Sequence, residues 1–238
     1  MNHFFELVLD IIFPPQCLIC KKKLEDHVLK VVCKNCFQKI GINNGFFCPK
    51  CKKRLYEPKN NCHPETKFIL AAATFFENEI IRELIYALKY KNLKSAVEPI
   101  FEILKIYLEK ICAAEIFESN NFLIIPVPLH KKRERARGFN QTQLLAQKLS
   151  LFLNNVQIEK NALIKTKNTK SQTELNNYEE REKNIAGSFA ANEPQKIKGR
   201  NIILLDDVFT SGATMKEAVR ILKEVGAKKI IGLVIVKT

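Results

Sequence analysis

The segment 202–214 constrains the fold of this chain more than any other part of it. Four apolar residues, Ile202 to Leu205, lead into the acids Asp206 and Asp207 and then into a short turn rich in hydroxyl groups. Apolar residues at helical spacing follow over 215–222, and 230–236 is again almost continuously apolar. Buried parallel strands have such uninterrupted apolar runs, so the segment predicts a strand–helix–strand unit in an α/β domain.

The turn between that strand and helix is a candidate phosphate site. A Gly-containing turn at a helix N-terminus presents backbone N–H groups and the positive end of the helix dipole, both of which favour an anion. The acids Asp206 and Asp207, expected at a solvent-facing strand end, can accept hydrogen bonds from neighbouring sugar hydroxyls. The P-loop and dinucleotide-binding patterns do not occur in the chain. The segment therefore predicts a site that reads a sugar and its phosphate together.

The rest of 67–238 has the alternation of an α/β domain. Strands are predicted over 68–76 and 122–127, and the three predicted helices have their apolar faces within 80–88, 97–111 and 144–152. The stretch from 165 to 200 is polar and predicts a long mobile loop with at most one short helix.

Cysteine usage divides the chain in two. Seven of the eight cysteines lie at or before residue 62, which predicts a Cys-rich module over 1–66 and a second domain over 67–238. Two C-x-x-C pairs have the spacing of a four-thiolate zinc ribbon and consist of Cys17, Cys20, Cys33 and Cys36. A disulfide framework is the alternative, and the lack of an export signal argues against it. The isolated Cys112 is expected to be a small buried hydrophobic residue.

A second metal site is left open by the sequence. Its candidate ligands are Cys48, Cys51, Cys62 and His63. Three cysteines with an ambiguous fourth donor are compatible with a second zinc ion and equally with a site that no longer closes.

The chain carries no targeting or membrane signal that we recognise. The residues before Phe13 predict a short docking helix, because acids interrupt the apolar positions and no cleavage site follows. The apolar runs are shorter than the roughly 18 residues that a membrane-spanning helix requires. These features predict a cytoplasmic protein without a transmembrane segment.

Lysine and arginine exceed acids by 39 to 25, for a net charge of +14. Such a surface favours polyanionic partners, although a basic surface without a specific partner has the same composition. The densest basic run comprises Lys131, Lys132, Arg133, Arg135 and Arg137. The aromatic residue Phe139 follows it closely. This pattern predicts a loop that contacts single-stranded nucleic acid, with Phe139 as a stacking surface, and a solvated face or a phosphate-contacting loop is the alternative.

Several motifs resemble a known family. The acids and the Thr-Ser-Gly-Ala-Thr turn resemble the phosphoribosyl pyrophosphate (PRPP) loop of type I phosphoribosyltransferases. Four further motifs occur in the order found in the ComF/ComFC competence family, namely Phe13-Pro14-Pro15-x-Cys17-x-x-Cys20, Ala87-Leu88-Lys89-Tyr90-Lys91, Pro126-Val127-Pro128-Leu129-His130 and Arg137-Gly138-Phe139-Asn140-Gln141. The resemblance covers nearly the whole chain and implies a phosphoribosyltransferase-like parallel sheet flanked by helices, preceded by a small zinc ribbon.

The resemblance also implies roles for individual residues. Asp206 and Asp207 would be the catalytic acids on the ribose hydroxyls. The 5′-phosphate would be surrounded by Thr210, Ser211, Gly212, Ala213 and Thr214. The pyrophosphate, with Mg²⁺, would lie near Pro126, Val127, Pro128 and Leu129. The flexible loop of the family corresponds to Lys165, Lys167, Gln172 and Arg181, with lysines at 165 and 167 where the family usually has arginines.

Two functions follow from these expectations. The first is a protein that binds PRPP and handles single-stranded DNA together with the competence machinery of natural transformation. The second is an active phosphoribosyltransferase of nucleotide metabolism, which would transfer phosphoribose to an unidentified nitrogenous acceptor.

Overall fold

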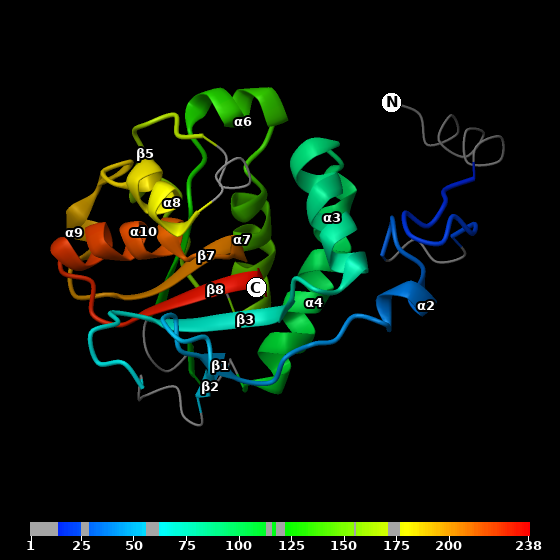
Figure 1. Ribbon diagram of the computed structural model, residues 1–238, viewed down its shortest axis with the longest axis horizontal. Helices are drawn as coiled ribbons and strands as arrows, with labels where there is room; N and C mark the ends of the chain where they lie inside the picture. Colours follow the sequence, from blue (N-terminus) through cyan, green and yellow to red (C-terminus); the bar gives the residue numbers. More distant parts are fainter. Residues whose placement is uncertain are drawn as a thin grey trace.

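A computed structural model describes residues 14–24, 29–55, 62–112, 116–117, 122–154, 156–170 and 177–238. Figure 1 gives the arrangement of the elements. The docking helix expected before Phe13 lies outside the described residues. No helix in the described part of the chain combines the length and the apolar character that crossing a bilayer demands.

Four adjacent parallel strands form most of the main sheet, as the sequence predicts. They are β3 (Ile69–Phe75), β4 (Phe122–Pro126), β7 (Asn201–Phe209) and β8 (Ile230–Lys237). Within the described residues the sheet has the order β2-β1-β3-β8-β7-β4, so β7 lies between β8 and β4. The conserved geometry of such sheets puts ligands at the carboxyl ends of the strands.

One layer of helices covers the face of the sheet that Ile203 and Leu205 of β7 present. It consists of α3 (Glu79–Tyr90), the 3₁₀ turn η1 (Lys94–Ala96), α4 (Val97–Lys110) and α7 (Gln141–Phe152). The helical faces expected within 80–88, 97–111 and 144–152 are the faces that pack in this core. Amphipathic periodicity therefore locates these three helices correctly.

The opposite face, with Ile202 and Leu204, is covered by elements from the C-terminal half. These are β5 (Leu163–Lys165), α8 (Tyr178–Ile185), β6 (Phe189–Ala191), α9 (Pro194–Ile197) and α10 (Ala213–Glu224). The expectation of a long mobile loop with at most one helix is wrong for much of 165–200. Buried Ile185, Phe189 and Ile197 anchor this stretch to the sheet, and β5 pairs with β6.

The Cys-rich segment is joined to the main sheet. It contains α2 (Lys34–Phe37), β1 (Phe46–Phe47) and β2 (Arg54–Leu55). Strand β1 pairs antiparallel with β3, and the Tyr107 hydroxyl of α4 donates a hydrogen bond to the Gly45 carbonyl at 2.8 Å. The division at residue 66 stays a prediction, and the sheet itself continues across it.

Candidate functional site

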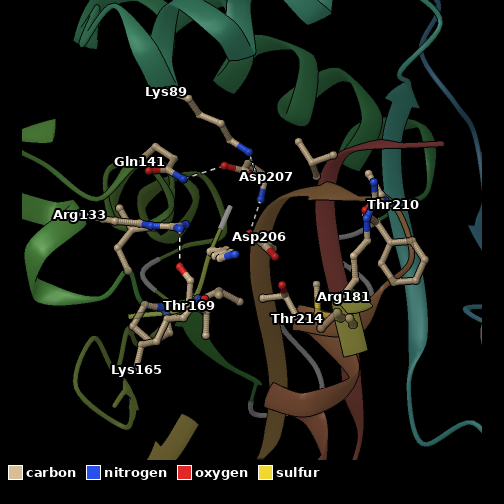
Figure 2. Close-up of a pocket in the computed structure, with 18 of the residues that line it drawn as sticks. Lys89, Arg133, Gln141, Lys165, Thr169, Arg181, Asp206, Asp207, Thr210 and Thr214 are labelled. Carbon is tan, nitrogen blue, oxygen red and sulfur yellow. Dashed lines mark hydrogen bonds and ion pairs between the residues drawn. The ribbon is translucent and has the colours of Figure 1, made fainter. Parts of the chain in front are cut away.

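A pocket of about 490 Å³ opens at the carboxyl ends of β4 and β7. Figure 2 shows its side chains, which come from β7, the turn after it and both helical layers. Among the described residues that line the pocket, two are acidic, Asp206 and Asp207. Six are basic, namely Lys89, Arg133, Arg137, Lys165, Lys170 and Arg181. This excess of positive charge suits a phosphorylated ligand.

Asp207 is the buried member of the acid pair, with 5% of its surface exposed. Lys89 of α3 forms an ion pair with one carboxylate oxygen at 2.7 Å, and the Gln141 amide of α7 donates to the other at 2.6 Å. Figure 2 shows both side chains converging on it. The expectation that both acids face solvent is therefore wrong for Asp207, whose buried charge depends on these two partners.

Asp206 faces the pocket and is partly exposed. Its carboxylate accepts a hydrogen bond from the Asp207 backbone N–H at 2.8 Å. Burial by the surrounding protein and the adjacent charge of Asp207 raise the pKa of Asp206 to about 7. Desolvation and the charge of Arg133 lower the pKa of Lys165 to about 8. The pocket thus holds an acid and an amine that titrate near neutral pH.

The turn after β7 has the geometry of an anion cradle. Gly212 has φ of +76° and immediately precedes α10, and a Cβ atom there would lie 2.5 Å from Cζ of Phe209. Only glycine combines that conformation with so close a contact. All five expected turn residues line the pocket, namely Thr210, Ser211, Gly212, Ala213 and Thr214.

The segment after β4 forms another wall of the pocket. Val127, Pro128 and Leu129 line it, whereas Pro126 is the last residue of the strand. The Val127 N–H donates to the Leu205 carbonyl at 2.8 Å, and its own carbonyl accepts from the Thr142 hydroxyl at 2.8 Å. This wall is fixed by β7 on one side and α7 on the other.

Only some of the residues expected in a flexible loop line the pocket. Lys165, at the end of β5, and Arg181, on α8, both line the pocket. The Lys167 ammonium instead donates to the Ala186 carbonyl at 3.2 Å. Gln172 lies outside the described residues.

The basic run forms a helix, α6 (Lys131–Arg137), where we expected a loop. His130 caps its N-terminus, and Gly138 ends it with φ of +77°. Arg133 donates to the Thr169 carbonyl at 2.5 Å and Arg137 to the Gln141 side-chain oxygen at 2.5 Å, and both line the pocket. The remaining cations of the run are exposed on α6 and are Lys131, Lys132 and Arg135.

Phe139 does not offer a stacking surface. It is buried, with 7% of its surface exposed, and the ammonium of Lys94 lies 5.4 Å from its ring centroid. Phe139 belongs to the apolar core that also contains residues of α3, α4 and α7, so the expectation for this residue is corrected.

Sequence reasoning missed two residues that organise the site. Lys89 and Gln141 stand in motifs that carry the family resemblance, but no chemistry pointed from them to Asp207. The only signal available was their place in those motifs, because polar residues are ordinary on amphipathic helices. Gln141 is 3% exposed, which is unusual for a side chain of its type.

Both cysteine clusters have the geometry of a four-ligand metal site. In each set the ligand atoms lie within 4.8 Å of one another, and the sets are Cys17, Cys20, Cys33, Cys36 and Cys48, Cys51, Cys62, His63. Two sulfurs bound to one tetrahedral zinc ion are about 3.8 Å apart. The Cys20–Cys33 sulfur distance is 3.7 Å. Thiolate and imidazole ligands in this arrangement fit zinc.

The second cluster closes through His63. Its Nδ1 lies 3.4 Å from the Cys48 sulfur and 3.3 Å from the Cys62 sulfur. Glu65, two residues after His63, pairs with Lys50 and is not among the ligand atoms of this cluster. Of the two possibilities left open by the sequence, the closed site is the one that this geometry favours.

Comparisons with known proteins agree with both halves of this description. A phosphoribosyl transferase domain model matches residues 136–238, and a double zinc ribbon domain model matches residues 8–65. The class is therefore a phosphoribosyltransferase-type α/β protein with an N-terminal pair of structural zinc sites.

Three known proteins are similar in sequence to this chain. "Competence protein ComFC" of Bacillus subtilis (strain 168) is 25% identical in an alignment of 231 positions, which covers 88% of this chain and 89% of that protein. "Competence protein F" of Haemophilus influenzae is 35% identical over 108 residues, or 45% of this chain and 46% of the relative. "DNA utilization protein YhgH" of Escherichia coli (strain K12) is 36% identical over 107 residues, 45% of each chain. These matches support the resemblance of the chain to the ComF family.

We expect two zinc ions per chain, measured by elemental analysis of protein purified without chelator. His63→Ala should reduce the content to one, because the second site loses its fourth ligand. Cys112→Ser is the control and should retain both ions, since Cys112 is exposed, contrary to our expectation of burial, and belongs to neither cluster. Protein with no zinc would contradict the assignment.

Asp206 should make stability depend on pH. Its pKa is about 7 in the folded protein against an ordinary value of 3.8, so the folded state retains a proton that the unfolded chain loses. The contribution of Asp206 to the free energy of unfolding should therefore decrease as pH rises from about 4 to about 7. Urea unfolding of Asp206→Asn should show a flatter pH profile over this range than wild type, and coincident profiles would contradict the raised pKa of Asp206.

Proposed function

We propose that this protein binds PRPP with Mg²⁺ in the β7 pocket and handles single-stranded DNA in a competence-related role. The observation that carries the proposal is the segment 210–214, which leads into the N-terminus of a twelve-residue helix and follows the acid pair after two residues. An anion cradle beside an acceptor of sugar hydroxyls matches a ribose 5-phosphate ligand. The names of the three relatives support the biological context.

Mg²⁺ suits this ligand, because a hard cation prefers the oxygens of phosphates and carboxylates. Asp206 is the acid available to it, since both oxygens of Asp207 are engaged by Lys89 and Gln141. When bound, the metal would neutralise charge on the diphosphate. Lys89, Arg133 and Lys165, which line the pocket, would supply the remaining positive charge.

Single-stranded DNA is the partner that the basic surface supports. The net charge is +14, and α6 presents exposed cations next to the pocket through Lys131, Lys132 and Arg135. Contacts with phosphates release counterions and favour any nucleic acid, while an open pocket rim is accessible to a flexible single strand.

Phosphoribosyl transfer to a nitrogenous acceptor is the second candidate. The observation in its favour is that Asp206 and Lys165 line the same pocket. Their surroundings there raise the pKa of the acid to about 7 and lower the pKa of the amine to about 8, and groups that titrate near neutrality suit proton transfer. Release of pyrophosphate on addition of free bases, assayed with and without single-stranded DNA, would distinguish turnover from binding alone.

Asp206→Asn should weaken binding of PRPP in the presence of Mg²⁺ at least tenfold in isothermal titration calorimetry. The amide retains the shape of the side chain but loses a charged acceptor, and hydrogen bonds to charged groups contribute about 1.5–3 kcal/mol. Glu224→Gln is the matched control, because Glu224 pairs with Arg220 on the exposed side of α10 and should bind as wild type does. Equal affinity in wild type and Asp206→Asn would remove the sugar-binding assignment.

Replacing Lys131, Lys132 and Arg135 together by alanine should flatten the salt dependence of single-stranded DNA binding. Each phosphate contact contributes about −0.7 to the slope of log affinity against log salt. The control removes three exposed cations of the other helical layer, Lys196, Lys198 and Arg220, and should leave the slope unchanged. Fluorescence anisotropy measures both, and a slope unaffected by the α6 replacements would place the DNA contact elsewhere.

A further inference from the structure

Two tyrosine rings stand one helical turn apart on the exposed face of α3. Tyr86 and Tyr90 have 49% and 52% of their surfaces exposed, and their ring centroids are 5.1 Å apart with planes inclined by 37°. The core of the protein uses the other face of this helix, through Ile81, Leu84 and Leu88. Packing therefore does not require aromatic residues at these two positions.

The rings lie between positive charge and the pocket. The ammonium of Lys91 is 5.3 Å from the ring centroid of Tyr86, and Tyr90 lines the pocket together with Arg133 and Arg137 of α6. Helices α3 and α6 stand at the same end of the molecule (Figure 1). A ligand on these rings would thus have cations on both sides of it.

An aromatic surface flanked by cations matches one kind of ligand in particular. A single-stranded nucleic acid has flat base faces that stack on aromatic rings and phosphates that pair with lysine and arginine. Stacking is tolerant of sequence, because every base has such a face. A ligand that is only anionic, such as a free polyphosphate, would use the cations and leave the rings unoccupied.

We propose that Tyr86 and Tyr90 form a stacking platform for a nucleobase of single-stranded DNA, with Lys91 and the exposed cations of α6 holding the adjacent phosphates. The inference rests on the proposed function, since it specifies how a strand reaches the pocket. It also replaces Phe139, whose buried ring cannot stack, as the aromatic contact.

The test compares two double variants with two strands of equal length, oligothymidylate and an abasic strand with the same phosphates. Tyr86→Ala with Tyr90→Ala should bind oligothymidylate about tenfold more weakly than wild type, with an unchanged salt slope, because stacking rather than charge is lost. Tyr86→Phe with Tyr90→Phe retains both rings and should bind as wild type does. Leu151→Ala, which removes a side chain that is 72% exposed on α7, is the control for loss of apolar surface and should have no effect.

The abasic strand separates stacking from a structural role of the tyrosines. Wild type should bind it more weakly than oligothymidylate, and the alanine variant should bind both strands equally. If the alanine variant binds oligothymidylate as tightly as wild type, or loses affinity equally for both strands, the platform is refuted while DNA binding itself stands. If wild type binds neither strand, the DNA-handling function fails and the platform fails with it.

Discussion

The buried carboxylate of Asp207 connects the elements that form the site. A charge removed from water is tolerated only when its partners are close and well directed, and Asp207 has Lys89 at 2.7 Å and Gln141 at 2.6 Å. These partners belong to α3 and α7, so one residue of β7 connects three elements that are far apart in the sequence. Loss of either partner would leave a buried group uncompensated at the floor of the pocket.

The two adjacent acids therefore have different roles in the site. Because strand residues alternate in direction, Asp206 and Asp207 point to different surroundings although they are neighbours. Asp207 is fixed to the helices, and Asp206 faces the pocket with its pKa raised to about 7. Binding of a positively charged or metal-bound ligand at Asp206 would favour its ionised form, which links occupancy of the pocket to pH.

Local patterns in the sequence predicted the fold well, because they report local physics. The apolar run that leads into Asp206 and the turn with Gly212 were recognisable from the order of residue types alone. The same is true of the metal-ligand spacings around Cys17 and Cys33. The contacts of Lys89 with Asp207 span 118 residues and have no local signature. The same holds for the burial of Phe139, which depends on how α7 packs, and for the structure within 165–200, where a few buried apolar residues are enough to order a polar segment.

The zinc-binding segment is part of the main sheet. Its strand β1 extends the central sheet beside β3, and the Lys237 ammonium at the end of β8 lies 4.5 Å from the ring centroids of both Phe47 and Phe75. Zinc sites supply folding free energy to small modules. Metal binding near β1 should therefore also stabilise the edge of the sheet on which it is built.

The central claim is that the pocket at the end of β7 is a PRPP site organised by its two acids. A crystal structure of the protein grown with PRPP and Mg²⁺ tests it most directly. The account predicts electron density for the 5′-phosphate in the turn 210–214 and for the ribose against Asp206, with Asp207 still held by Lys89 and Gln141. Density for PRPP at another place, or a pocket without PRPP at saturating concentration, would contradict it.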